Sequence, residues 1–502
     1  MDLFLTADLG TSAAKIVILD ESFNTVASVT QEYSYITPQF DYAEIDPETY
    51  YRAFRDGISR MATEKGVDLK AIKTISVCSQ AETFVMLDSD KKPLMNAIVW
   101  IDNRATEEVN IIKNEFERRE IFRKTGQQDI VPTWTACKLL WLKRNKKDLY
   151  KNIKHILFVE DYLIFKLTGE HFTDFSLQPS SLLFNIVDFT WWDDMLDFLN
   201  LNREQLPTAV ESGKIVGEIS AVASKELGLN PKVVVVSGAM DHMAGLIGSG
   251  NLEPGVTTET TGTVLAICTT VDRPIYDPEM RIPLYLHSLK GKYVLLPWSH
   301  TSGIILRWFR DKFFIDISLE KDVTRTFTYD KLTALAERIN PGSDGLIMLP
   351  FFGGAGSPEL DAKAKGVLFG MTLTHEKGHF IRAIMESIAY VLKSNIQALE
   401  EMGVSINEIR SLGGGAKSDL WCQIKADVLN KKVIKLDIEE VSPLGLAILS
   451  GLAVGKYENV HEAVKKHVKI YKTFIPDKNN SDIYRECYEK YVEIYQNLKD
   501  VF

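Results

Sequence analysis

This sequence of 502 residues has few cysteines, no long apolar run and no excess of positive charge. Its five cysteines are scattered without paired spacing, which favours free thiols in a reducing compartment over a disulfide framework. The apolar stretches are only as long as strands, so we expect no membrane span. The net charge of −10 argues against nucleic acid or an anionic membrane surface as the main partner.

The remaining composition is that of a globular protein. Hydrophobic residues make up 45% and charged residues 25% of the chain, and low-complexity segments are absent. The first ten residues, MDLFLTADLG, have no basic leader and carry acids at positions 2 and 8, so we expect no signal peptide and a cytoplasmic location. The length exceeds the size at which single cores stop growing, which predicts two domains.

The first hundred residues predict a mixed α/β fold. Three strands joined by tight turns are expected at LFLTADLG, KIVILD and TVASVTQEYSY (residues 3–10, 15–20 and 25–35). Residues 46–66 predict a helix, with Asp46 as its cap, Pro47 at the first position and Gly66 past the end. A further strand is expected at 72–80. A strand meander followed by a helix and a strand indicates α/β without simple βαβ alternation.

The second half of the chain restarts this scheme. KVVVVSGAMDHMAGLIGSG (232–250) precedes TTETTGTVLAICTT (257–270), where a Gly-Thr turn again separates two β-like segments. The match to the opening stretch covers few positions and is weak support for a repeat. A boundary near residue 250 would divide the chain into comparable halves, and long helices are expected later at 378–403 and 442–455.

The turn after the first strand is suited to phosphate oxygens. Gly10 permits a close backbone approach, and Thr11 and Ser12 add hydroxyl donors beside the amides of the turn. Asp8 could hold a magnesium ion, which prefers oxygen ligands, and Lys15 could supply a cation. The alternative is an ordinary solvated hairpin in which the carboxylate satisfies turn amides.

A second turn of the same kind shifts the balance towards phosphate binding. Thr261, Gly262 and Thr263 form a Thr-Gly-Thr turn in the second half of the chain. Two phosphate-type turns in two halves predict a nucleotide held in a cleft between domains.

A third glycine cluster follows a strand and opens a helix. It consists of Gly413, Gly414, Gly415, Ala416 and Lys417. A Walker A loop is excluded because that loop needs G-x-x-x-x-G before its Lys-Ser pair. The glycines would let a flat group such as a nucleobase or ribose lie against the backbone, or they serve only a strand-helix turn that needs positive φ.

The strand of four valines ends in a bend that presents Asp241. A carboxylate in a cleft that holds phosphates is well placed as a general base for a hydroxyl group that attacks the γ-phosphorus. The alternative is that Asp241 caps the following helix. His242 is expected to be a substrate hydrogen-bond donor or a structural residue rather than a second base.

A mixture of acceptors, donors and an aromatic edge suits polyhydroxy ligands, and such residues occur at two predicted strand ends. They are Gln80, Glu82, Trp100, Asp102 and Arg104. Asp102 and Arg104 could instead form only a surface ion pair.

The sequence HEKGH at 375–379 matches the zincin pattern. Zinc binding would require His375 and His379 on one face of a rigid helix, but Gly378 lies between them and the helix is expected to begin only near this point. We interpret the match as chance and keep a zinc peptidase only as a remote alternative.

Taken together, these stretches resemble the FGGY family of carbohydrate kinases, in the actin-like ATPase superfamily. TWTACKLLWLKRN (133–145) is similar to the first family signature, with Lys138 in place and an unusual Thr133 at its first position. GVLFGMTLTHEKGHFIRAIMESI (366–388) fits the second signature and includes the HEKGH match. Further similar stretches are DYAEIDPETYY, DYLIFKLTGE, TSGIILRWF and LPFFGGAGSPELDAKAKG.

The resemblance implies two ribonuclease-H-like domains that flank a hinged cleft. Residues 1–248 would bind the sugar and carry the base Asp241, and residues 249–502 would bind ATP. Asp8 and Asp241 would be associated with Mg²⁺. The phosphates would be held by Gly10, Thr11, Ser12 and Lys15 and by Thr261, Gly262 and Thr263, and the adenosine by residues 413–417. Closure would exclude water, and a homodimer is compatible with the resemblance.

The resemblance does not define the substrate. Glycerol kinases carry Arg-Glu where this chain has Ala81 and Glu82, and xylulokinases carry Met-His there. After the base, these enzymes tend to have Gln or Asn, whereas this chain has His242. The small Ala81 leaves room, which favours a sugar or polyol longer than glycerol. We expect a ketopentose, with glycerol, another polyol or a sugar acid as the alternatives. An actin-like or chaperone-type ATPase without a sugar acceptor is the rival class.

Overall fold

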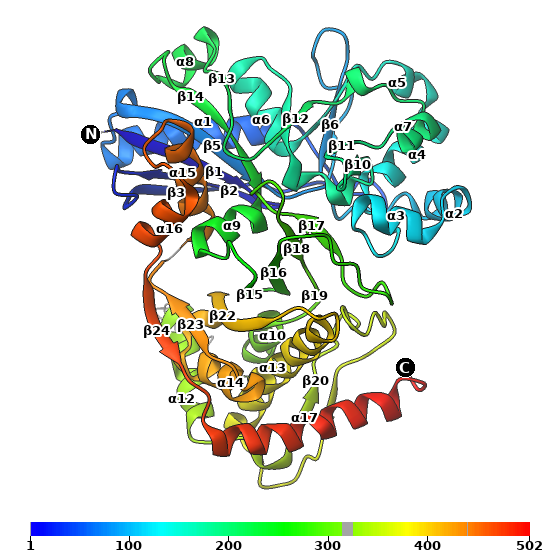
Figure 1. The fold of residues 1–502 in the computed structure, drawn as a ribbon, viewed down its shortest axis with the longest axis vertical. Coiled ribbons are helices and arrows are strands. Elements are labelled where there is room, and N and C mark those ends of the chain that lie inside the picture. The colour runs from blue at the N-terminus through cyan, green and yellow to red at the C-terminus, as the bar shows by residue number, and fades with distance from the viewer. Residues whose placement is uncertain (1, 314–324, 439) are drawn as a thin grey trace.

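Two β-sheets organise the computed structural model, which describes residues 2–313, 325–438 and 440–502 (Figure 1). The first sheet has six strands in the order β13-β14-β5-β1-β2-β3. The second has eight, in the order β17-β18-β16-β15-β22-β23-β24 with β19 paired to β16. This mixed α/β architecture confirms the predicted fold class.

The first sheet is a strand meander extended by parallel strands. β1 and β2 pair antiparallel, as do β2 and β3, while β5 runs parallel to β1 and β14 parallel to β5. The strands are β1 (Leu3–Leu9), β2 (Ala13–Leu19), β3 (Thr25–Glu32), β5 (Ile72–Ser79), β13 (Ile215–Glu218) and β14 (Val234–Met240). Nearly every residue of β1, β5 and β14 is buried, which explains their continuous apolar runs.

The second sheet repeats this arrangement. β15 (Gly255–Thr261) pairs antiparallel with β16 (Leu265–Val271), and β22 (Ile406–Gly413) runs parallel to β15, as β5 does to β1. The topology therefore shows the repeat that only a few matching sequence positions indicated. The other strands are β17 (Leu284–Leu286), β18 (Tyr293–Leu295), β19 (Trp298–Ser299), β23 (Val433–Leu436) and β24 (Ile470–Phe474).

The predicted helix after the meander forms as α1 (Glu48–Lys65). Pro47 is its N-cap rather than its first helical residue, and Gly66 ends it in the left-handed conformation. Asp46 still serves the helix start, because its Oδ1 accepts the Glu48 amide at 3.1 Å.

Helices cover the faces and ends of both sheets. Besides α1, the α-helices before residue 250 are α2 (Thr106–Glu115), α3 (Arg118–Thr125), α4 (Thr135–Asn145), α5 (Lys147–Lys151), α6 (Val159–Thr168), α7 (Asp193–Leu199), α8 (Ala221–Leu227) and α9 (Asp241–Ser249). Later helices are α10 (Gly303–Phe313), α12 (Arg325–Glu337), α13 (Lys377–Glu401), α14 (Asp419–Leu429), α15 (Val441–Ala453), α16 (Val460–His467) and α17 (Lys478–Leu498). Of the described helices, none is both long and apolar enough to cross a membrane.

Smaller sheets complete the structure. A four-stranded sheet has the order β4-β7-β6-β8 and consists of β4 (Glu44–Ile45), β7 (Ala97–Ile98), β6 (Phe84–Leu87) and β8 (His155–Phe158). Three two-stranded sheets pair β9 (Phe172–Asp174) with β12 (Thr208–Val210), β10 (Phe184–Asn185) with β11 (Thr190–Trp191), and β20 (Ile347–Leu349) with β21 (Val367–Phe369).

Helices α15 and α16 return from the second half of the chain to the first sheet (Figure 1). α15 contacts β1, β5 and β14, and both helices share an apolar cluster with Phe4 and Val17 of that sheet. A boundary between residues 248 and 249 therefore assigns the two sheets to different halves of the chain. Helices α15 and α16 belong to the second half in sequence but pack on the sheet of the first half.

The backbones of α9 and α15 touch through glycines. A Cβ atom at Gly248 would lie 1.8 Å from the carbonyl oxygen of Val441 and 2.8 Å from the Gly445 amide. A Cβ atom at Gly445 would lie 1.9 Å from the carbonyl oxygen of Ala244. Only hydrogen atoms fit between these helices, so both positions require glycine.

We expect Gly248→Ala to lower the free energy of unfolding by about 1–3 kcal/mol, because the added methyl group forces α9 and α15 apart. Gly245→Ala on the same helix is the matched control, since its Cβ would have its nearest contact at 3.4 Å. Urea denaturation measures both variants. Equal unfolding midpoints for the two would contradict this account of the packing.

Candidate active site

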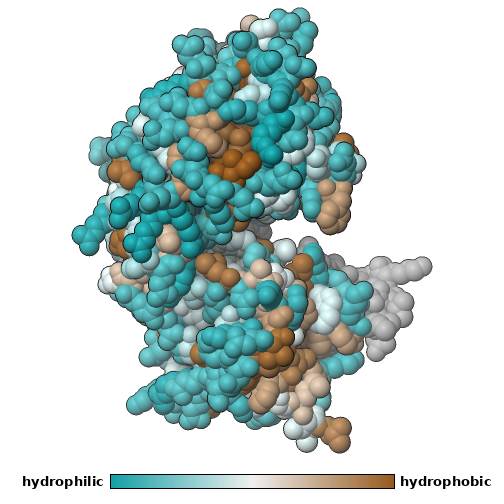
Figure 2. Space-filling model, turned by 90° about the vertical axis from the view of Figure 1, so that its right-hand side faces the viewer, coloured by the Kyte–Doolittle hydropathy of each residue, from teal (hydrophilic) through white to brown (hydrophobic). Residues whose placement is uncertain are grey.

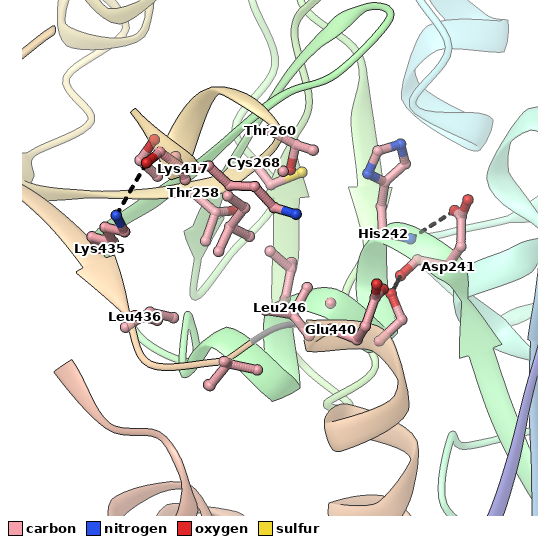
Figure 3. Close-up of a pocket in the computed structure, with 18 of the residues that line it drawn as sticks. Asp241, His242, Leu246, Thr258, Thr260, Cys268, Lys417, Lys435, Leu436 and Glu440 are labelled. Carbon is pink, nitrogen blue, oxygen red and sulfur yellow. Dashed lines mark hydrogen bonds between the residues drawn. The ribbon is translucent and has the colours of Figure 1, made fainter. Parts of the chain in front are cut away.

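A cavity of about 670 Å³ lies between the parts of the chain built on the two sheets (Figure 3). The surface is deeply indented between these parts (Figure 2). Six of the predicted site residues line the cavity together: Asp8, Asp241, His242, Gly413, Ala416 and Lys417. The Lys417 side chain extends across it towards the wall that carries Asp241 and His242 (Figure 3).

Asp241 is the first residue of α9, directly after the buried strand β14. Its Oδ1 accepts the amide of His242 at 2.6 Å, but Met240 is the N-cap of α9 and no side chain caps this helix, so the alternative interpretation of Asp241 as the cap is wrong. Its Oδ2 makes no hydrogen bond within the described residues, and the side chain lines the cavity. One carboxylate oxygen is thus fixed and the other is available to a ligand.

Asp8 approaches Asp241 from the end of β1. Burial and, in second place, the nearby charge of Asp241 raise the pKa of Asp8 to about 7, although a hydrogen bond with Cys78 acts in the opposite direction. A buried carboxyl group whose pKa is raised beside a second carboxylate indicates a site that favours a bound cation.

The turn between β1 and β2 is closed by the Gly10 amide, which donates to the carbonyl of Ala13 at 3.0 Å. The Thr11 hydroxyl donates to Gln80 Oε1 at 2.6 Å and accepts from Trp100 Nε1 at 2.8 Å. This hydroxyl therefore joins the turn to two of the residues predicted to bind the sugar. We call that set the sugar wall: Gln80, Glu82, Trp100, Asp102 and Arg104. Ser12 is exposed.

Lys15 forms an ion pair with Glu440, which precedes α15 and also lines the cavity. The pair connects β2 of the first sheet to a segment that enters from the second half of the chain.

The second turn lies between β15 and β16 and is closed by the Gly262 amide, which donates to the carbonyl of Val264 at 3.0 Å. The Thr263 carbonyl accepts the amide of Ser302 at 3.0 Å, and the Thr261 hydroxyl donates to Glu259 at 2.7 Å. Neither this turn nor the Gly10 turn is among the cavity-lining residues, although Thr258 and Thr260 of β15 are.

Glycine is required for different reasons at Gly413, the last residue of β22, and at Gly415, two residues later. Gly413 has φ +74°, as the strand-helix interpretation requires. A Cβ atom at Gly415 would lie 2.6 Å from Thr261 Cβ, so the two loops nest against one another. At Gly414 the nearest atom would be 3.8 Å away, which leaves that position open.

None of the five residues of the predicted sugar wall is among the residues that line the cavity. Gln80 and Trp100 both form hydrogen bonds with the Thr11 hydroxyl, and Trp100 is 38% exposed. Buried Glu82 has φ +62°, a conformation that costs energy for a non-glycine residue. Desolvation raises its pKa to about 7, with Asp241 contributing in the same direction and Lys138 in the opposite one.

Comparison with known proteins identifies the family. A profile of the FGGY family of carbohydrate kinases, N-terminal domain, matches residues 3–248, and the profile of its C-terminal domain matches residues 261–454. The chain belongs to the FGGY family of carbohydrate kinases. It is therefore a carbohydrate kinase, and the family implies use of ATP and typically of a divalent metal.

Similar proteins within this family carry different names. The chain is 29% identical to a xylulose kinase of Bacillus subtilis, covering 100% of this chain and 98% of that protein. It is 32% identical to a glycerol kinase of Thermococcus gammatolerans, covering 94% and 93%. The crystal structure of a gluconate kinase from Lactobacillus acidophilus superposes with a TM-score of 0.89 at 29% identity, covering 99% and 98%.

Asp102 and Arg104 form an ion pair, but it is buried, so the alternative of a surface pair is wrong. Arg104 Nε and Nη2 donate to the two Asp102 oxygens at 2.9 and 2.8 Å, and Nη2 also donates to Glu44 at 2.8 Å. The guanidinium group lies 4.0 Å from the centre of the Tyr42 ring. Both charged groups are satisfied within this FGGY protein's core, away from the lining of the cavity.

The HEKGH histidines are engaged in local contacts. His375 lies before α13, and its Nδ1 accepts the Thr372 amide at 3.0 Å. His379 accepts the Glu376 amide through Nδ1, and its Nε2 lies 3.0 Å from Asp344. Among the described residues, no group of three or more His, Cys, Asp or Glu side chains is arranged to hold a metal ion.

Several residues near the site were not assigned a role from the sequence. Glu440, Ser411 and Tyr471 line the cavity. Buried Lys138 donates to the carbonyls of Val99 at 2.9 Å and Trp100 at 3.2 Å, and burial lowers its pKa to about 8. Its place in the first FGGY signature was the only signal available for Lys138.

Proposed function

We propose that the protein transfers the γ-phosphoryl group of ATP to a terminal hydroxyl group of a small ketose or polyol, with Asp241 as the general base. The observation that carries this proposal is the shared cavity: Asp241 and Asp8 form one wall, and Gly413 and Lys417 form another. The free Oδ2 of Asp241 is where a substrate hydroxyl could donate its proton.

For the nucleotide, we propose that residues 413–417 hold the adenosine, with the open position at Gly414 against the flat group. The turns at Gly10 and Gly262 would hold the phosphates. Residues 1–248 would then carry the sugar and the base, and residues 249–502 most of the ATP site. All of these parts come from one chain, so a homodimer is not needed to complete a site.

The residues at Asp8 and Asp241 fit a magnesium ion. Mg²⁺ is usually bound by one or two carboxylates together with waters and substrate phosphates, and the Asp8 carboxyl, whose pKa is raised by burial and by the charge of Asp241, lies beside Asp241 here. When bound, the ion would neutralise charge on the transferred phosphate. The protein's own part is to orient the hydroxyl, accept its proton at Asp241 and exclude water.

For the acceptor, we propose a ketopentose bound by Gln80, Glu82 and Trp100 beside the small Ala81. The buried Glu82 carboxyl disfavours a second carboxylate nearby, which supports a neutral sugar over a sugar acid. Glycerol or another polyol is the alternative within the family, since the similar proteins include a glycerol kinase.

Release of ADP should depend on the acceptor. We expect a coupled assay across ketopentoses, ketohexoses, polyols and sugar acids to give the highest kcat/KM with a ketopentose. ATP hydrolysis that no acceptor stimulates would instead favour an ATPase of the actin-like class.

Asp241→Asn should reduce turnover by about 10²- to 10⁴-fold, because the amide cannot accept the hydroxyl proton. ADP binding, measured by calorimetry, should persist. Asp193→Asn is the matched control, since Asp193 is the exposed first residue of α7 and should leave turnover unchanged. Full activity of Asp241→Asn would end the assignment of the base.

Glu82→Ala should raise the KM for the sugar while the KM for ATP changes little, because Glu82 belongs to the sugar wall alone. Glu107→Ala, at an exposed position of α2, controls for loss of a negative charge. Equal changes in the KM for the sugar and the KM for ATP would contradict the assignment of Glu82 to the sugar site.

A further inference from the structure

A fully buried ion pair lies beneath the two loops proposed to hold the nucleotide. Lys425 of α14 and Glu259 of β15 both have 0% exposed side chains, and Lys425 Nζ lies 2.6 Å from Glu259 Oε1. Removing two charges from water is costly, and apolar residues of similar size are often at least as stabilising. Stability alone therefore does not account for this pair.

Two hydroxyl groups close the pair into a network. Thr261 Oγ1 donates to Glu259 Oε2 at 2.7 Å and accepts from Lys425 Nζ at 3.0 Å. Ser411 Oγ donates to Glu259 Oε1 and accepts from Lys425 Nζ at 3.2 Å. The ammonium group thus uses its three donors on three oxygens, and each hydroxyl both donates and accepts. A network satisfied in this way holds its members in one geometry.

The two hydroxyls lie at the ends of the strands that lead into the two loops. Thr261 ends β15 directly before Gly262, and Ser411 lies in β22 two residues before Gly413. The parallel register pairs Thr261 with Gly413.

The loop after β22 rests directly on the network. A Cβ atom at Gly415 would come within 3.2 Å of Lys425 Nζ. A displacement of the ammonium group would therefore shift the backbone of both loops.

We propose that Lys425 is a positioning residue for the nucleotide, because it fixes the spacing between the Gly262 turn and the 413–417 loop through the hydroxyls of Thr261 and Ser411. This inference rests on the proposed function, which assigns these two loops to ATP. Lys425 itself does not line the cavity.

The test separates positioning from stability. Lys425→Met leaves Glu259 buried and unpaired, so it should lower both the Tm and the affinity for ADP. Lys425→Met/Glu259→Met removes both charges and should recover most of the Tm. We expect the double variant still to bind ADP about tenfold more weakly than the wild type and to show a raised KM for ATP, with the KM for the sugar changed less than twofold.

A second buried pair serves as the control. Arg382 of α13 donates to Glu386 at 2.9 Å, and neither residue lines the cavity. Arg382→Met should lower the Tm without weakening ADP binding by the folded protein.

Calorimetry with ADP distinguishes the possible failures. Wild-type protein that binds no ADP would overturn the proposed function together with the positioning role. Wild-type protein that binds ADP alongside a double variant of equal affinity would overturn the positioning role alone. A double variant that does not fold would make the network a folding element and also overturn that role.

Discussion

The parallel alignment of β1, β5 and β14 is the constraint on which the site depends. Parallel strands end at the same edge of a sheet, so Asp8 near the end of β1, Glu82 after β5 and Asp241 after β14 converge although they are far apart in sequence. The same relation between β15 and β22 brings Thr261 beside Gly413. Each of the two sheets, which share the same strand arrangement, thus contributes one wall of the cavity in this carbohydrate kinase.

Burial of charge is the second recurring theme. Desolvation and the charge of Asp241 raise the pKa of both Asp8 and Glu82 to about 7. Both carboxyl groups are therefore close to half-protonated at neutral pH. The charges of Arg104 and Lys425 are instead paired fully within the protein. The carboxyl groups of Asp8 and Asp241 thus line the cavity, where a ligand can reach them, whereas the paired charges hold the surrounding segments in place.

The sequence supported the parts of the site that are local. The glycine turn after Asp8 and the valine strand ending at Asp241 could be predicted because each is a strand followed by a bend. Asp102 and Arg104 were predicted to bind substrate, with a surface ion pair as the alternative, and neither interpretation anticipated their buried pairing, which depends on Glu44 and Tyr42 about 60 residues earlier. Short-range patterns carry no information about such partners.

The sequence by itself therefore determined the fold class, the glycine turns and, through its motifs, the FGGY resemblance. Tertiary structure alone decided that α15 returns to the first sheet, that Gly248 and Gly445 meet, and that Lys425 finds Glu259 166 residues away. The physical reason is that strand and turn propensities act over a few residues, whereas the burial and pairing of a side chain depend on which distant segment the register of the sheet places against it.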